Sequence, residues 1–419
     1  MSARRIAIVG AGPVGLEAAL RARAEGHEVA VYEAGRVGEH FARYGPVRLF
    51  TPFGMNSTEL GRERLRVAGT RLPGDEQTLS AAELRERYLL PLSRLPELEG
   101  VICENARIVA IGREGLPKGQ SRGREARMFL LRVESGRGGG ARLDRADVVI
   151  DASGVYATAN ATGPGGLPAL GEESLGDRLE RHLPDVPGQA RARYAGKRIL
   201  LVGDGRSAAN VIADLDTLVR VGRDAAGTRV EWVHRERGEE ALAPVPVAEL
   251  ERLPVLRELA DRAAGIAREA PWIRRHRGAT IVAYRSLPSG AVEATLQDAR
   301  GAEQRIEVDR VLALVGYRPD LSLFRELQIH LCYASEGPMA LAAAILAAES
   351  KDPAAAQSCL GQVPHGPETL KNPEPGFYIL GVKSYGRRPM FLLTLAHRQV
   401  EDVMGLIAAA EPRLNLASR

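Results

Sequence analysis

The sequence predicts an α/β protein with more than one domain, and three observations support this prediction. The chain has 419 residues, 45% of them hydrophobic, which is enough for two or three buried cores. Near residue 10 an apolar strand leads into a glycine-rich turn and a helix, and the same pattern returns near residue 203. Further apolar strands that end at small residues follow each pattern, so we expect parallel sheets covered by helices.

Charge and composition restrict the functional classes. The chain contains 57 lysines and arginines and 53 aspartates and glutamates, spread along its length, so the net charge of +4 does not indicate a nucleic-acid partner. The longest apolar run, residues 339–348, is shorter than the about 20 residues that cross a bilayer. Cys103, Cys332 and Cys359 are too few for a disulfide framework, and neither a signal peptide nor metal-ligand spacing occurs. We expect a cytoplasmic protein with no metal and no membrane partner.

The first strand–turn–helix–strand unit covers residues 5–33. Gly10 allows the tight turn, Gly12 lets the backbone approach a pyrophosphate, and Gly15 lets the helix pack on the strand. Glu33 ends the second strand, where a carboxylate is placed to accept hydrogen bonds from an adenosine ribose. The alternative is that the glycines only shape a turn. The residues expected to contact this nucleotide are Gly10, Gly12, Pro13, Gly15, Glu33 and Gly38.

The second unit begins at residue 197 and predicts a second nucleotide. Its turn carries Gly203 and Gly205, and Ala208 replaces the third glycine, while Ser207 is placed to cap the helix or bind a phosphate. Its second strand ends in cations suited to the 2′-phosphate of NADPH. These cations are His234, Arg235 and Arg237. Because Glu236 lies among them, a solvated basic turn is the alternative, and NADH stays possible as the cofactor.

Two more apolar strands complete a pattern of four motifs. One runs through V-V-I-D-A-S-G from residue 148, and the other through V-L-A-L-V-G-Y-R-P-D to residue 320. With the two glycine turns, these motifs occur in the order found in the two-dinucleotide-binding-domain flavoproteins. The chain therefore resembles this superfamily, which includes the pyridine nucleotide-disulfide reductases and the flavin-containing monooxygenases.

The resemblance implies two Rossmann-like domains, with an NAD(P)H domain inserted into a discontinuous FAD domain. The FAD domain would comprise residues 1–160 and 310–419, and the NADPH domain residues 196–309. Residues 161–195 would form a linker, because Pro- and Gly-rich joints occur there. Residues 36–60 would run past the flavin, although plain packing explains their composition equally well. The further cofactor contacts that the resemblance implies are Ile108, Ala152, Ser153, Gly154, Gly316 and Gly381.

The resemblance also bears on the reaction. The sequence has no C-x-x-C pair, which disfavours a dithiol reductase, and Asp309 to Tyr317 approximates a motif of flavin monooxygenases and amine N-hydroxylases. We expect an FAD enzyme that consumes NADPH and oxygenates a small nucleophilic substrate through a C4a-(hydro)peroxyflavin. The alternatives are an NADPH-dependent reductase or dehydrogenase that passes electrons to a quinone, metal or protein acceptor without a redox dithiol, and a nucleotide-binding redox sensor without turnover.

The C-terminal section supplies the catalytic candidates. It resembles the last FAD-binding strand of the family, followed by a helix from about residue 390, and it has Gly381-Val382-Lys383 where the reductases have Gly-Asp. Lys383 and Arg388 would add charge that stabilises a reduced flavin, and a basic surface loop is the alternative. Tyr385 would lie in the substrate pocket or in the core.

Three other segments carry structural predictions. Ser80 begins a capping box and a helix that extends to residue 90. Gly- and Arg-rich stretches at residues 112–127 and 135–142 would join the strands of a surface β-hairpin. The Ala-rich run at residues 338–356 would form a helix on the surface, at the substrate entrance or in a homodimer contact.

Overall fold

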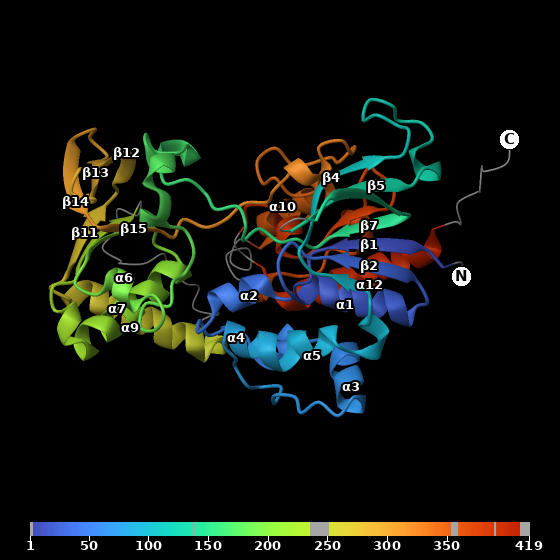
Figure 1. Cartoon of the computed structure of the whole chain (residues 1–419), viewed down its shortest axis with the longest axis horizontal. Helices are drawn as coiled ribbons and strands as arrows, with labels where there is room; N and C mark the ends of the chain where they lie inside the picture. Colours follow the sequence, from blue (N-terminus) through green and yellow to red (C-terminus); the bar gives the residue numbers. More distant parts are fainter. Residues whose placement is uncertain (1–2, 137–138, 235–250, 353–358, 389–390, 411–419) are drawn as a thin grey trace. The chain divides into compact units, whose positions relative to one another are not determined.

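A computed structural model describes residues 3–136, 139–234, 251–352, 359–388 and 391–410 (Figure 1). The chain divides into two compact units. Unit 1 comprises Met1–Ala42, Thr51–Thr158 and Arg318–Arg419, and unit 2 comprises Arg43–Phe50 and Ala159–Tyr317. The predicted fold class is confirmed, because each unit is built on a five-stranded parallel sheet.

The central sheet of unit 1 has the strand order β16-β7-β1-β2-β3, and its paired strands are all parallel. These strands are β1 (Arg5–Val9), β2 (Glu28–Tyr32), β3 (Ile102–Cys103), β7 (Val148–Asp151) and β16 (Phe377–Ile379). Helices α1 (Pro13–Ala24) and α12 (Leu393–Ala409) pack together against it (Figure 1). Side chains that alternate along β1 serve the two layers: Ile8 lies beside the start of α1, and Ala7 joins the core under the second sheet.

That second sheet of unit 1 is antiparallel and contains β4 (Ala106–Arg113), β5 (Phe129–Ser135) and β6 (Ala141–Ala146). The Gly- and Arg-rich stretches join these strands, as predicted. The longer connection is anchored, because Arg124 is buried and its guanidinium donates to the Glu374 carboxylate at 2.7 Å, which also accepts from Arg113 at 2.6 Å. The shared carboxylate compensates two buried cations and fixes the connection on unit 1.

The remaining helices of unit 1 are short. They are α2 (Glu39–Tyr44), which continues into unit 2, α3 (Glu59–Val67), α4 (Ala81–Leu84), a π-helical turn (Arg85–Leu89), α5 (Leu90–Ser93) and α10 (Met339–Lys351). The predicted capping box is confirmed, since Ser80 and Glu83 exchange side-chain-to-backbone hydrogen bonds. The π-helical turn precedes Pro91, which lacks the N–H of a regular α-helical bond. Short 3₁₀ helices occupy Phe53–Asn56, Pro96–Leu98, Arg124–Ala126, Ser322–Phe324, Cys359–Gly361, Pro367–Leu370 and Gly381–Tyr385.

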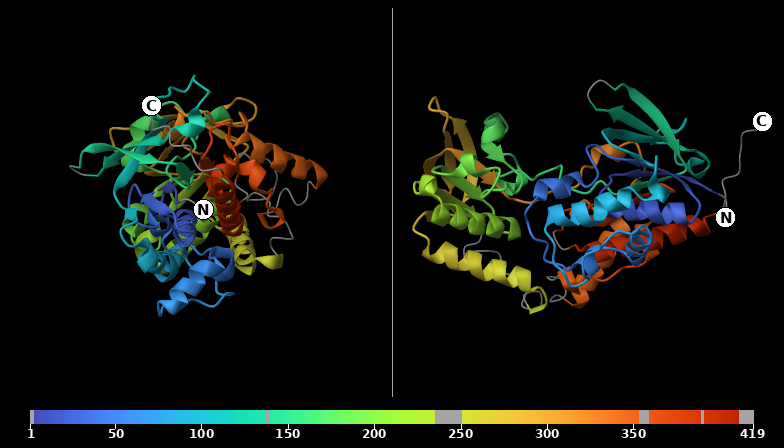
Figure 2. Two further views of the ribbon diagram at one scale, coloured as in Figure 1. Left: turned by 90° about the vertical axis from the view of Figure 1, so that its right-hand side faces the viewer. Right: turned by 60° about the horizontal axis from the view of Figure 1, so that its bottom comes forward.

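Unit 2 repeats this architecture. Its parallel sheet has the order β11-β10-β9-β15-β8. The strands are β8 (Leu179–Glu180), β9 (Arg198–Val202), β10 (Arg229–His234), β11 (Ile273–Arg277) and β15 (Arg310–Ala313). One face packs against α7 (Arg206–Val221) and α9 (Pro254–Glu269), which lie side by side in Figure 2, and the short α6 (Arg191–Tyr194) precedes β9. The other face packs against an antiparallel sheet of β12 (Thr280–Ser286), β13 (Val292–Gln297) and β14 (Glu303–Val308).

Three boundaries differ from those predicted. Residues 161–195 form part of unit 2 rather than a linker, because β8 pairs with β15, and Val186 and Tyr194 are buried in the core of unit 2. Residues 310–317 also belong to unit 2, since β15 pairs with β9. Unit 2 further includes Arg43–Phe50, from the segment assigned to the flavin domain. Short 3₁₀ helices of unit 2 occupy Pro164–Gly166, Glu172–Arg178 and Arg223–Ala225.

Within the described ranges, no helix is both long and apolar enough to cross a membrane.

Candidate functional site

The glycine turn of unit 1 connects β1 to α1. Each of its glycines is needed for a different structural reason. Gly10 has φ +100°, and a Cβ there would lie 2.8 Å from the Ala152 carbonyl oxygen. A Cβ on Gly15 would lie 1.9 Å from the Gly10 carbonyl oxygen, so the helix packs as closely as glycine allows. A methyl group on Gly12 would meet nothing within 4 Å, and Gly12 gives α1 no side-chain cap. The start of α1 therefore opens onto space that a phosphate group would fit.

Glu33 lies just beyond β2 and holds this turn. Its Oε2 accepts a hydrogen bond from the Ala11 N–H at 2.8 Å, and its Oε1 accepts one from the Gly35 N–H at 2.8 Å. Each carboxylate oxygen keeps a second lone pair, so the side chain can accept from ribose hydroxyls while fixing the turn. Gly38 has φ +64°, and its N–H donates to the Ala11 carbonyl oxygen at 3.0 Å.

A buried ion pair joins the turns that follow β7 and β16. The Lys383 ammonium lies 2.7 Å from Asp151 Oδ2 and 3.0 Å from Ser153 Oγ, and the Lys383 and Asp151 side chains are 1% and 0% exposed. Asp151 Oδ1 accepts hydrogen bonds from the N–H and hydroxyl of Ser153. Ala152 donates its N–H to the Val9 carbonyl oxygen, which places this cluster directly against the end of β1.

The turn after β16 is also held from α12. Gln399 accepts a hydrogen bond from the Gly381 N–H at 2.9 Å and donates one to Ser384 Oγ at 2.9 Å. Gly381 has φ +72°, and a Cβ there would lie 3.3 Å from a methyl of Val14 in the first turn of α1. Gly154 also has positive φ, +71°, and a Cβ there would meet only a methyl of Val382, at 3.9 Å. The segments predicted to bind FAD therefore meet at the carboxyl ends of β1, β7 and β16.

The other catalytic candidates have partners within unit 1. Arg388 forms an ion pair with Glu349 of α10. Tyr385 is buried against Phe391, and this burial raises the pKa of its hydroxyl to about 12. Lys383 is neutralised by Asp151, as described above, so neither Lys383 nor Arg388 is an unpaired positive charge.

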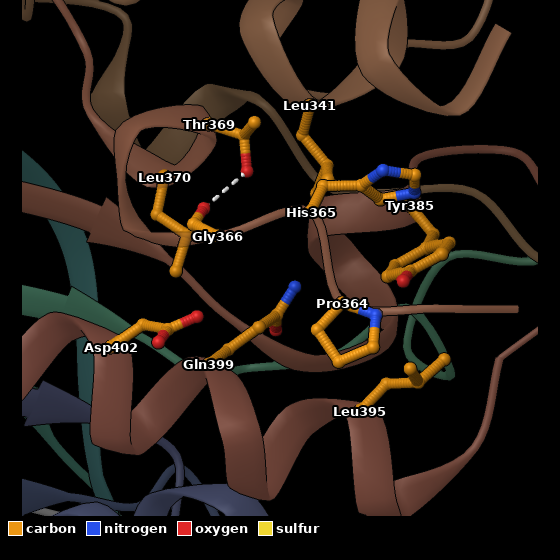
Figure 3. Close-up of a pocket in the computed structure, with 10 residues that line it drawn as sticks. All are labelled: Leu341, Pro364, His365, Gly366, Thr369, Leu370, Tyr385, Leu395, Gln399 and Asp402. Carbon is orange, nitrogen blue, oxygen red and sulfur yellow. Dashed lines mark hydrogen bonds between the residues drawn. The ribbon is translucent and has the colours of Figure 1, made fainter. Parts of the chain in front are cut away.

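Tyr385 also lines a small cavity between α10, α12 and residues 364–370 (Figure 3). The cavity holds about 10 Å³, room for a single water molecule and not for an organic substrate. Burial lowers the pKa of His365 in this cavity and raises that of Asp402. Both groups are therefore biased toward their neutral forms. The other lining residues are Leu341, Pro364, Gly366, Thr369, Leu370, Leu395 and Gln399.

The glycine turn of unit 2 matches that of unit 1. Gly203 has φ +118°, and a Cβ there would lie 2.4 Å from the Leu314 carbonyl oxygen. Gly205 precedes α7 without a side-chain cap, and a methyl there would meet nothing within 4 Å. Ser207 is in the first turn of α7, and Ala208 is fully buried against the sheet. Gly316 follows β15 with φ +83°, as Gly154 follows β7 in unit 1.

The predicted 2′-phosphate residues are only partly described. His234 ends β10 but is 2% exposed, and its ring lies 4.8 Å from that of Trp232. Arg235 and Arg237 lie outside the described residues. His234 is therefore part of the core at the strand end rather than an exposed cation.

Ile108 is buried in the core between the two sheets of unit 1. The contact between Ile108 and a cofactor stays a prediction.

Sequence reasoning missed the pairing of Lys383 with Asp151 and the role of Gln399. The available signals were a carboxylate at the end of an apolar strand, in V-V-I-D, and a lysine directly after a strand-end glycine. Two such charges beside buried strands need each other as partners.

No protein-family model matches the chain, and no curated protein sequence matches it. Solved structures do match over nearly the whole chain. Bacillithiol disulfide reductase Bdr (YpdA) from Bacillus cereus is 16% identical with a TM-score of 0.68, and the match covers 98% of this chain and 100% of that one. The ornithine N-hydroxylase KtzI from Kutzneria sp. 744, in a structure with reduced FAD, NADP⁺ and L-ornithine, is 14% identical with a TM-score of 0.62, covering 97% and 99%. DfoA, an FAD-bound cadaverine monooxygenase from Erwinia amylovora, is 12% identical with a TM-score of 0.63, covering 99% and 97%.

These matches include both predicted branches, a disulfide reductase and two monooxygenases. At 12–16% identity they bear on the fold. The chain has the fold of these enzymes, and unit 2 is inserted into unit 1, as its sequence motifs predicted.

Proposed function

We propose that the protein is an oxidoreductase that binds FAD in unit 1 and NADPH in unit 2, and that it oxygenates a small nucleophilic substrate. The observation that carries this proposal is the pair of matching glycine turns. In each turn, the glycine before the helix faces open space at the carboxyl ends of a parallel sheet. Such a turn binds the pyrophosphate of a dinucleotide.

Residues of unit 1 fit FAD. Gly12 and the start of α1 would bind the pyrophosphate, and Glu33 would bind the adenosine ribose. The turns at residues 152–154 and 381–384 would contact the rest of the cofactor. Bound FAD would supply electron transfer from NADPH to oxygen, and these residues would orient it and limit access of water.

The choice of a monooxygenase over a disulfide reductase rests on the cysteines. A dithiol mechanism needs two thiols in reach of each other. Of the cysteines whose side chains are described, Cys103 is on edge strand β3 and Cys332 is in the loop before α10, and both are free. The matches to an ornithine N-hydroxylase and a cadaverine monooxygenase support the same choice. The higher TM-score of the bacillithiol disulfide reductase supports a reductase as the second candidate.

Two glycine variants test the cofactor assignment. Gly12 and Gly205 have φ −82° and −81°, which any residue adopts, and each faces open space, so valine should fold at both positions. Gly12→Val should abolish FAD binding. Gly205→Val should keep FAD but raise KM for NADPH. Gly265→Val is the matched control, because this glycine in α9 also has nothing within 4 Å but lies outside both turns.

The reaction class is tested with ¹⁸O₂. The FAD-loaded protein is supplied with NADPH, ¹⁸O₂ and a panel of primary amines and sulfides. One ¹⁸O atom in a product for each NADPH oxidised supports a monooxygenase. Oxidation of NADPH that needs only a quinone, dye or disulfide acceptor would replace it with the reductase. FAD binding without NADPH oxidation would instead indicate a nucleotide-binding sensor.

A further inference from the structure

The Lys383–Asp151 pair has an unusual environment for two charges. Both side chains are excluded from solvent, and the pair joins residues that are 232 positions apart in the sequence. The ammonium donates to Asp151 and to Ser153, and it lies 5.3 Å from the centre of the Phe324 ring. Its three N–H groups are therefore accounted for by two oxygens and an aromatic face.

Such a pair is a poor device for stability alone. Removing two charges from water costs about as much as their attraction returns, and apolar residues of similar volume often serve a core equally well. Each partner also lies next to a strand-end turn rather than in the middle of a layer. We therefore look for the function of the pair in the two turns that it connects.

We infer that Lys383 and Asp151 form a preformed clamp of the flavin site. Lys383 is a positioning residue: it connects the turn at residues 381–385 to the turn at residues 152–154, and Asp151 balances its charge. This inference rests on the proposed binding of FAD in unit 1.

The surrounding contacts support a clamp. Ser153 contributes both its N–H and its hydroxyl to Asp151, so the first turn is fixed through its backbone as well as its side chain. Gln399 fixes the second turn independently through Gly381 and Ser384. The turns are thus held by contacts within the protein itself, which reduces the ordering cost of binding.

The first test measures FAD affinity of the apoprotein by quenching of flavin fluorescence. Lys383→Met removes the ammonium at similar length, and the double variant Lys383→Met/Asp151→Asn removes both charges. Loss of a supporting contact at metal sites typically costs 10- to 100-fold in affinity, and by analogy we expect Kd for FAD to rise about tenfold or more in both variants. Lys371→Met is the matched control, since Lys371 pairs with Glu368 on the surface at 2.5 Å, and its Kd should equal that of the wild type.

The double variant separates positioning from folding. A single variant leaves one buried charge without its partner and is expected to melt at a lower temperature. The neutral double variant should recover most of the apoprotein melting temperature but not the affinity for FAD. Recovery of both would overturn the clamp and leave a purely structural pair.

The second test measures the midpoint potential of the bound flavin. Lys383→Met leaves Asp151 as a net negative charge and should make the potential more negative. Asp151→Asn leaves the ammonium and should make it more positive, because positive charge stabilises a reduced anionic flavin. Shifts of the same sign, or none, would contradict a charge-balanced site beside the flavin.

The outcomes also separate this inference from the proposed function. If the wild-type protein binds no FAD, the proposed function fails first. If the wild type binds FAD and every Lys383 and Asp151 variant binds it equally well, only the clamp fails.

Discussion

The two units share one architecture but close their nucleotide turns differently. In both units the first glycine of the turn lies against the carbonyl oxygen of a residue at the end of a neighbouring strand. This residue is Ala152 for Gly10 and Leu314 for Gly203. At the third motif position, however, unit 1 has Gly15 and unit 2 has a buried alanine. The same topology thus tolerates different spacings between helix and turn, and the local distance, not the motif, decides which residue fits.

The strand ends differ as well. Unit 1 ends β7 with Asp151, paired with Lys383, and follows β2 with Glu33, which accepts from two backbone N–H groups. At the matching positions unit 2 has Ala313 and the buried His234. At these two positions unit 1 has charged side chains with bonded partners, whereas unit 2 has a small apolar residue and a buried imidazole. We therefore expect the two units to respond differently to mutation and pH.

The largest effect is expected from a methyl group at the third position of the motif. Gly15→Ala places a Cβ against the Gly10 carbonyl oxygen and should cost about 3 kcal/mol of the free energy of unfolding, together with FAD affinity. The reciprocal Ala208→Gly should cost only about 1 kcal/mol, the helix-propensity difference. Chemical denaturation of both variants measures the contrast, and equal costs would show that the two turns pack alike.

One buried group in each unit should contribute to acid stability in opposite directions, His397 in unit 1 and Asp214 in unit 2. Burial lowers the pKa of His397 in α12 to about 4, so the unfolded chain binds more protons between pH 6.5 and 4, and unit 1 loses stability as pH falls through this window. Burial raises the pKa of Asp214 in α7 to about 6, so the folded chain binds more protons between pH 6 and 4, and unit 2 gains stability there.

Because one pKa unit corresponds to about 1.4 kcal/mol and His397 as a whole residue is partly exposed, we expect His397 to contribute a loss of about 2 kcal/mol to unit 1 at pH 4. Amide hydrogen exchange at pH 4 to 7 resolves the two units separately. His397→Asn should flatten the response of unit 1 alone, and Asp214→Asn that of unit 2 alone. A variant whose pH response equals that of the wild type would refute the assignment for that residue.

The smallest effect concerns the cofactor preference of unit 2. His234 is buried, so discrimination between NADPH and NADH should depend on Arg235 and Arg237, outside the described residues. Replacing both by alanine should raise KM for NADPH about tenfold, because charge-assisted bonds to a phosphate are lost, and should leave KM for NADH nearly unchanged. Steady-state kinetics with both nucleotides measures this, and equal changes would exclude these arginines from phosphate binding.

Features formed by residues close together in the sequence were predicted, whereas features formed by residues far apart were not. The glycine turns, the Ser80 capping box and the strands beside them were predicted because each depends on neighbours in the sequence. The Lys383–Asp151 pair was not, because only the tertiary fold brings together residues so far apart. The extent of unit 2 was also misjudged at residues 161–195, since Pro- and Gly-rich joints occur inside compact units as well as between them.

Segment 43–50 limits how far unit 2 can be treated as a module. Its flanks belong to unit 1, yet Tyr44 and Val47 pack against the core of unit 2. Residues 159–317 cut out as a fragment would therefore lack part of their own apolar covering. A domain inserted in place of residues 159–317 would have to pack against segment 43–50 of the host protein in the same way. To exchange this domain between such proteins, in the laboratory or during evolution, both segments of unit 2, residues 43–50 and 159–317, must be transferred together.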